Sequence, residues 1–289
     1  MKTEIIDPDR ASAAHLPEIA SLLGQVFHRR RAWLDELKWA YLDHPLGRSW
    51  WVNVRDDSGA LVAHSGLLPV SMLDDQRFDQ IPVWFSLNTA VRPDAAMPGL
   101  MIAGLRNLLR TLEAKGPAIV LGVANAKSAD GFERFLGFHS LGPLSLTLLP
   151  PWRAPSPAVP RAVRLDASTL LWRGKRPGAD TYASSRGEQV LRRVRHLGFP
   201  LDGVLTTQAP KTMLSDTGLT SRTGLWRLPA PRLYASFGGP IRGGVAVPSR
   251  LRPSPLRYIC RSLAKSVDNS VLADFLAVRR FEFIDFDVL

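Results

Sequence analysis

The sequence predicts an α/β fold of the mixed α+β type, in which helices flank a central sheet, with a second domain following. Three observations predict it. Apolar residues recur at spacings of three and four over residues 15–29 and 100–114, as in amphipathic helices. Residues 50–91 are rich in Val, Trp, Phe and Ile, as strands are. Residues 118–123 are short and wholly apolar, which is typical of a strand buried on both faces.

The first 150 residues indicate the element order α-α-β-β-β-α-β-α-β. A second helix over residues 32–43 precedes two strands that flank a turn at residues 57–59. The helix over 100–114 stops at a Lys-Gly-Pro sequence, and a helix over 128–136 stops at Gly137. We therefore expect a mostly antiparallel sheet with one parallel β-α-β unit.

A proline-rich segment divides the chain. PPWRAPSPAVPR has five prolines in twelve residues, as a linker does. We assign one domain to residues 1–150, a linker to 151–164 and a basic second domain to 165–289. A faint similarity between the two halves has two interpretations: the second domain is a degenerate copy of the first, or the match is due to chance. Its expected elements are helices over 187–197, 256–266 and 270–278, strands over 203–207, 232–237 and 241–247, and a terminal strand.

The positive charge is concentrated in the second half. Of the net charge of +11, residues 1–150 hold 15 Lys+Arg against 16 Asp+Glu, and residues 151–289 hold 22 against 10. A basic domain favours polyanionic partners such as nucleic acid or anionic glycans. The alternative is a generally arginine-rich surface that serves solubility, because the arginines are scattered.

Cys260 is the only cysteine, so the chain has no internal disulfide and no zinc site built on cysteine pairs. We interpret this thiol as a packing residue.

No apolar run reaches the roughly 18 residues of a membrane helix. The first ten residues lack the apolar core of a signal peptide. These observations favour a cytoplasmic protein.

Residues 89–109, TAVRPDAAMPGLMIAGLRNLL, combine a strand end, a proline turn, a glycine and a helix start. A helix N-terminus offers unpaired backbone N–H groups and a partial positive charge, which suit a phosphate group. Gly99 lets the backbone approach such a group closely. Pro98 lies in the same loop and has no N–H to donate.

With residues 118–142, this segment resembles the GCN5-related N-acetyltransferases, a superfamily of acyl-CoA-dependent acyltransferases, over about residues 12–148. The family's central motif is a strand ending in Val-x-Pro, followed by Arg/Gln-x-x-Gly-x-Gly/Ala. Val91, Pro93 and Gly99 match this motif, whereas Ala96 and Met101 depart from it.

The family's next motif is a strand, an asparagine, a helix and a Gly-Phe pair. This sequence matches it with residues 120–123, Asn125, residues 128–136 and residues 137–138. The resemblance implies acetyl-CoA or another acyl-CoA as co-substrate, with no metal. It assigns the pantetheine arm, the pyrophosphate and their surroundings to Thr89, Ala90, Val91, Met97, Gly99, Leu100, Met101, Asn125 and Ser128.

Acyl transfer to an amine needs a base and a donor that stabilises the oxyanion. His64, in the middle of a strand, and Asn88, on the strand that leads to Val91, are the candidates for facing the acceptor. The tyrosine that the family often keeps before the Gly-Phe pair is absent, because Phe132 and Glu133 stand in that region. Glu133 is interpreted as a solvent-facing residue.

Three functions remain open. The first is an N-acetyltransferase or other N-acyltransferase acting on an amine, with an amino sugar or glycan precursor as one candidate acceptor. The second is a catalytically silent binding module that kept the fold, favoured by Ala96, Pro98 and Met101. The third is an aminoacyl-tRNA-dependent aminoacyltransferase, which suits the basic second half. A nucleic-acid regulator is disfavoured, because no helix-turn-helix or paired aromatic platform is recognisable.

Overall fold

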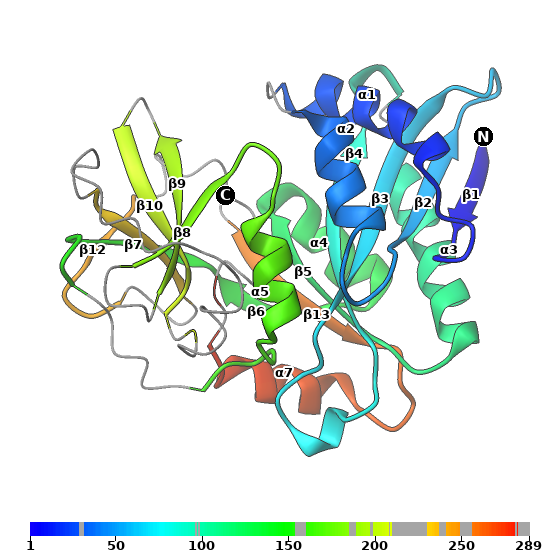
Figure 1. Ribbon diagram of the computed structural model, residues 1–289. Helices are drawn as coiled ribbons and strands as arrows, with labels where there is room; N and C mark the ends of the chain where they lie inside the picture. The colour runs from blue at the N-terminus through cyan, green and yellow to red at the C-terminus, as the bar shows by residue number, and fades with distance from the viewer. Residues whose placement is uncertain are drawn as a thin grey trace.

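The structure is a computed structural model of the 289-residue chain. It describes residues 1–28, 32–95, 97, 99–153, 160–184, 189–196, 199–207, 209, 230–236, 241–248, 256–280 and 282. These residues form two mixed sheets, of seven and six strands, which lie side by side in Figure 1 with a helix between them. The expected mixed α/β architecture with two domains is confirmed.

The first sheet has the strand order β1-β2-β3-β4-β5-β13-β6 and is antiparallel except between β4 and β5. Its strands are β1 (Lys2–Ile6), β2 (Trp50–Arg55), β3 (Leu61–Val70), β4 (Val83–Val91), β5 (Ile119–Asn125), β6 (His139–Pro143) and β13 (Leu256–Ser262).

Helices cover both faces of this sheet, and each face has its own apolar core. One core contains residues of α3 (Leu100–Lys115) and α4 (Ala126–Leu136). The other contains residues of α1 (Leu16–Phe27), α2 (Trp33–Leu37), the π-helical turn η2 (Lys38–Leu42) and α7 (Asn269–Ala277). Short 3-10 turns join these elements at η1 (Ala13–His15), η3 (Gln76–Phe78) and η4 (Pro93–Ala95).

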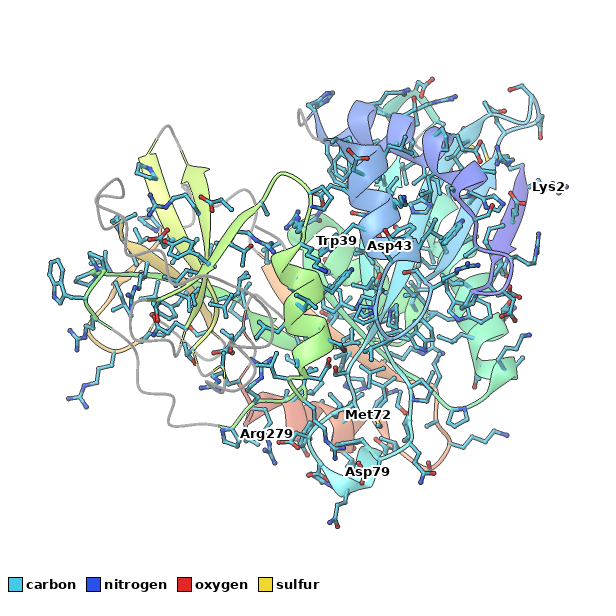
Figure 2. All side chains as sticks on the ribbon, in the orientation of Figure 1. Lys2, Trp39, Asp43, Met72, Asp79 and Arg279 are labelled. Atoms are coloured by element: carbon cyan, nitrogen blue, oxygen red, sulfur yellow. The ribbon has the colours of Figure 1, made fainter. Side chains whose placement is uncertain are left out.

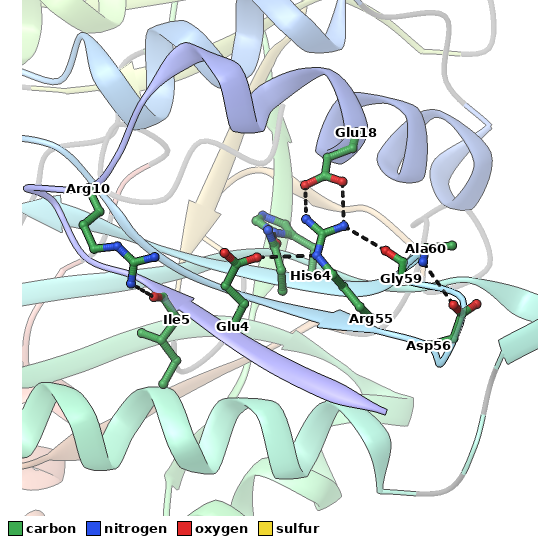
Figure 3. A network of polar contacts seen from close by, with 10 residues as sticks. Glu4, Ile5, Arg10, Glu18, Arg55, Asp56, Gly59, Ala60 and His64 are labelled. Carbon is green, nitrogen blue, oxygen red and sulfur yellow. Dashed lines mark hydrogen bonds and ion pairs between the residues drawn. The ribbon is translucent and has the colours of Figure 1, made fainter.

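Strand β1, which the sequence did not predict, is held at the sheet edge partly by Arg55. The Arg55 guanidinium pairs with Glu4 on β1 at 3.4 Å and with both carboxylate oxygens of Glu18 on α1 (Figure 3). Glu18 raises the pKa of Arg55. This contact joins the edge strand to the helix layer.

The second sheet repeats the arrangement of the first. Its order, β8-β9-β10-β11-β7-β12, corresponds to β2-β3-β4-β5-β13-β6, and the parallel pair again lies in the middle, between β10 and β11. A helix, α5 (Ala167–Gly174), again precedes the sheet. The strands are β7 (Ser145–Leu149), β8 (Asp180–Ala183), β9 (Val190–His196), β10 (Phe199–Thr206), β11 (Arg232–Ser236) and β12 (Val245–Ala246). We call these two units the first and second repeats.

The repeats exchange one strand. β7 follows β6 directly in the chain but pairs with β11 and β12 of the second sheet. β13 follows the second sheet in the chain but lies between β5 and β6 of the first. Each sheet therefore contains one strand that is adjacent in sequence to strands of the other sheet.

This exchange corrects the expected domain boundaries. Residues 256–277, which we assigned to the second domain at 165–289, complete the first sheet and its helix layer. The expected linker at 151–164 is not free throughout, because Ala162 and Arg164 exchange backbone hydrogen bonds with residues 72–74.

Two helix predictions in the second half were wrong. Residues 190–196 form β9, and residues 256–262 form β13. Tyr258, Ile259 and Cys260 are all buried, so β13 lacks the alternation by which a half-exposed strand is recognised. The strands near 203–207, 232–237 and 241–247 and the helix near 270–278 are confirmed. Most of the expected terminal strand lies outside the described residues.

Two stacked tryptophans join the repeats. Trp39 of η2 and Trp172 of α5 stack at 4.1 Å, with 8° between their planes. Each indole Nε1–H donates to the backbone carbonyl of the other residue at 2.9 Å. Trp39, which is labelled in Figure 2, lies where the first repeat approaches α5. The contact between the two residues is thus reciprocal.

Charged side chains surround this pair. Arg176 Nε lies 3.1 Å from both carboxylate oxygens of Glu36, and its guanidinium stacks over Trp39. His44 packs edge-on against Trp172 at 4.1 Å. A groove of about 540 Å³ opens beside the stack, lined from both repeats.

Replacing Trp172 by alanine is expected to lower the free energy of unfolding by about 3–5 kcal/mol, because it removes a buried indole and leaves the carbonyl of Trp39 without its donor. Urea unfolding measures the effect. Trp152 is 76% exposed, so Trp152→Ala is the matched control and should cost under about 0.5 kcal/mol. Equal effects of the two substitutions would contradict the role of the stack.

Candidate functional site

Strands β4 and β5 part in the middle of the first sheet. Their parallel pairing runs from Val83 with Ile119 to Ser86 with Gly122 and stops there. β4 nevertheless continues to Val91 and β5 to Asn125. Beyond Ser86, the edge of β4 that would face β5 therefore has no strand partner. We call this opening the first gap. It lies at the carboxyl ends of two parallel strands, from which α3 and α4 continue.

The loop that enters α3 has the geometry expected of a phosphate cradle. Gly99 is the residue before the helix and adopts φ +81°, a conformation that favours glycine. Leu100 and Ala103 use their N–H groups within the turn, whereas those of Gly99 and Met101 have no partner among the described residues. Both groups lie at the positive end of the helix dipole, where negative charge is favoured. Ala96 and Pro98 lie outside the described residues.

The Met101 side chain does not fill the first gap. It is 8% exposed and packs in the core between α3 and β2, where it approaches Gly104. The long Met101 side chain, at the position of the family's second glycine, is therefore accommodated in the core between α3 and the sheet. Met97, in the loop, is 59% exposed.

Asn125 and Ser128 are brought together at the start of α4. Asn125 Oδ1 accepts from the backbone N–H of Ser128 at 3.0 Å, which caps the helix. These two predicted site residues thus have a structural role at the rim of the first gap. The arginines nearest in sequence are engaged: Arg92 pairs with Asp94 at 2.7 Å, and Arg106 donates to the Phe135 carbonyl.

A bulge distorts β4 beside the first gap. The register between β3 and β4 shifts between Gly66, opposite Leu87, and His64, opposite Ala90. Asn88, inside the bulge, has φ +54°, a conformation that asparagine tolerates better than most residues. Thr89 bonds across to the Ser65 hydroxyl at 2.8 Å. Ala90 and Val91 pair with β3, so their other edge faces the first gap.

A buried chain of polar side chains leads from the core to this bulge. Asn88 Nδ2 donates to the Tyr41 hydroxyl at 3.2 Å, and this hydroxyl lies 2.9 Å from His64 Nε2. His64 Nδ1 lies 2.8 Å from Asn53 Oδ1. The Asn53 oxygen only accepts, so Nδ1 carries the proton and Nε2 accepts from Tyr41. We call these four residues the polar chain.

The polar chain is electrically neutral. Burial lowers the pKa of His64 to about 3 and raises the pKa of Tyr41 well above its usual value. The proton therefore stays on Tyr41, and the chain orients Asn88 without carrying charge. This differs from the expectation that His64 faces the cleft, because its ring is fully buried and both nitrogens are bonded.

Tyr41 and Asn53 were missed by sequence reasoning. A polar residue inside the apolar strand WWVNV was the available signal for Asn53, which lies directly opposite His64. Tyr41 approaches Gly66 so closely that a Cβ there would lie 2.3 Å from its hydroxyl. Only glycine admits this contact.

Phe132 and Glu133, which stand before the Gly-Phe pair, both contact other residues of the first repeat. Phe132 is buried and packs edge-on against Phe138. Glu133 lies 3.7 Å from Arg257, so the expected solvent-facing carboxylate forms an ion pair with β13.

In the part of the chain that the structure describes, no group of acidic, histidine or cysteine residues could hold a metal ion. No helix there is long and apolar enough to cross a membrane.

Solved structures share this fold. A GCN5-related N-acetyltransferase from Anabaena variabilis superposes with a TM-score of 0.55 at 12% identity, over 91% of this chain and 73% of its own. One from Kribbella flavida gives 0.51 at 13% identity, over 91% and 72%. No protein-family model and no curated protein matches the sequence. The resemblance is thus confirmed at the level of the fold, and it extends over both repeats.

The buried His64 makes stability depend on pH. Its pKa is about 3 in the folded chain and about 6.5 when unfolded, so the unfolded chain binds the proton first. The free energy of unfolding is therefore unaffected by His64 above about pH 6.5. As the pH falls from there toward 3, that free energy decreases by about 1.4 kcal/mol per pH unit. His44, whose pKa burial also lowers to about 3, adds a similar slope.

His64→Gln is therefore expected to reduce the slope of unfolding free energy against pH by about 1.4 kcal/mol per unit between about pH 6 and 4. Urea unfolding at several pH values measures it. Tyr41→Phe is the control: it should lower stability by about 1–3 kcal/mol, by leaving buried partners unpaired, while keeping the slope. An unchanged slope in His64→Gln would show that this histidine titrates normally.

Proposed function

We propose that this protein is an acyl-CoA-dependent N-acyltransferase whose acyl donor enters the first gap. The observation that carries the proposal is the end of the β4–β5 ladder at Ser86 and Gly122, with both strands continuing beyond it. Solved N-acetyltransferases with this fold support it. Acetyl-CoA is the donor we propose to test first.

In this proposal the donor is held by backbone groups. The pantetheine arm lies along the unpaired edge of Thr89, Ala90 and Val91 and takes the place that a further β5 residue would occupy. The pyrophosphate meets the N–H groups of Gly99 and Met101 at the start of α3, where the helix dipole favours negative charge. Backbone donors suit a chain whose nearby arginines are already paired.

The chemistry proposed is attack of a neutral amine on the thioester carbonyl. The carbon–nitrogen bond forms and the carbon–sulfur bond breaks, and the oxyanion between these steps needs a donor from the bulge in β4. The nitrogen loses one proton to solvent, and the departing CoA thiolate takes one proton up from solvent. The polar chain holds the bulge in place through Asn88. The acceptor we propose is an amine, with an amino sugar or a glycan precursor as candidates.

The alternative of a silent binding module is favoured by one observation. Phe132 and its neighbours place no tyrosine or free carboxylate beside the first gap. The aminoacyl-tRNA alternative relied on excess positive charge in the second half. Several of those arginines pair with carboxylates of the first half: Arg164 with Asp74 and Asp79, Arg176 with Glu36, and Arg279 with Asp75.

Calorimetric titration of acetyl-CoA into the purified full chain tests the proposal. We expect roughly micromolar affinity with a matching rise in the unfolding temperature, and release of free thiol when an amine acceptor is added. Binding without turnover on any amine would favour the silent module. Absence of heat and of thermal shift at millimolar ligand would overturn the proposal.

Gly99→Val is expected to weaken acetyl-CoA binding by at least about tenfold, because a β-branched residue is strained at φ +81° and its side chain enters the cradle. Gly178→Val is the matched control. Gly178 has φ +66° and open space around its Cβ, but it lies beyond α5 in the second repeat. It should cost similar stability and leave the affinity unchanged. Equal affinities for both variants would show that the pyrophosphate binds elsewhere.

A further inference from the structure

The second repeat contains a gap equivalent to the first. The parallel pairing of β10 and β11 covers Asp202 with Arg232 and Gly203 with Leu233, while β10 continues to Thr206 and β11 to Ser236. A register shift at residue 205 of β10 repeats the bulge of β4, two residues beyond the last pair in both sheets. Thr206 and Thr207 therefore correspond to the end of β4, where the proposed acyl-CoA binds.

A carboxylate from the end of the chain occupies this position. Glu282 Oε2 accepts from the Thr206 hydroxyl at 2.6 Å, and Oε1 accepts from the Thr207 hydroxyl at 2.5 Å and from its backbone N–H at 2.9 Å. Arg161 forms an ion pair with Oε2, and Arg280 Nε lies 3.6 Å from Oε1. The Glu282 side chain is only 4% exposed. A carboxylate has about four acceptor positions, and donors surround both of these oxygens.

The carboxylate binds at the carboxyl end of β10. Its hydrogen bonds go to Thr206, the last residue of this strand, and to Thr207, which follows it. The backbone of Arg280 pairs with residues 160–162, which brings Glu282 to this point.

We propose that the carboxyl end of β10 is a carboxylate-binding site, which the chain fills with its own Glu282, so that the second gap is closed to an external ligand. The site consists of two hydroxyls, one backbone N–H and the Arg161 guanidinium. Its ligand class is a carboxylate, held by charge-assisted hydrogen bonds. The protein then has one gap open to an acyl donor rather than two.

Chemical rescue tests the site directly. Glu282→Ala removes the carboxylate and leaves a space beside its donors, and we expect the unfolding temperature to fall by several degrees. Acetate, at about ten times its dissociation constant, should then raise that temperature by about 3 °C. Chloride at equal ionic strength should not. Glu282→Gln fills the same space with an uncharged amide, so acetate should leave it and the wild type unchanged. An equal acetate effect in both variants, or none in Glu282→Ala, would overturn the site.

Proteolysis gives a second measurement that does not need Glu282→Ala to fold. In the wild type, the backbone of Arg280 pairs with residues 160 and 162, and that of Arg279 bonds to Leu276 at the end of α7. Trypsin should cleave after these two arginines roughly tenfold faster in Glu282→Gln, because the segment opens more often when its anchor is weakened. Mass spectrometry locates the cut. An unchanged cleavage rate would mean that Glu282 does not hold the segment.

The closure of the second gap rests on the proposed function only where it concerns acyl-CoA. Titration of the wild type should saturate at one acetyl-CoA per chain. Saturation at two would overturn the closure while leaving the proposed function standing. No binding at all would overturn the proposed function, and the acetate experiment would still decide on the carboxylate site.

Discussion

The structure depends on the contact between Trp39 and Trp172. Each large indole is buried without cost to its N–H group, because each donates to the carbonyl of the other residue. The reciprocity requires that equivalent turns of the two repeats face one another. The strand exchange follows from the same placement, since β7 and β13 must each cross the short distance between sheets. The two repeats therefore share one continuous apolar core.

An ion pair between the two repeats also lies at this contact. Arg176, which follows α5, pairs with Glu36 of α2, and only 5% and 15% of these two side chains are exposed. The Arg176 guanidinium also lies over the Trp39 ring. Because both charged groups are buried, leaving either of them without its partner would be costly.

Sequence reasoning succeeded where local chemistry decides the structure. Gly116 and Gly137 mark helix ends as predicted, and Gly99 stands directly before α3, where the sequence indicated a helix start. It failed where the deciding contact is distant. β13 lies between strands more than a hundred residues away in the chain, and its two-sided burial removes the period that distinguishes strand from helix. The polar chain was missed because Tyr41 meets His64 only once the register of β2 and β3 is set.

The two repeats differ in the residues that lie beside their gaps. The pairing register places Ala183, Val190 and Leu205 of the second repeat where the first repeat has Asn53, His64 and Asn88, respectively. Tyr41 stands two residues after Trp39, and the residue two positions after Trp172 is Gly174. The second repeat thus lacks the whole polar chain. Among the described residues, Glu282 instead bonds to the hydroxyls at the end of β10. In the first repeat, buried hydrogen bonds reach the bulge from the core side through Asn88.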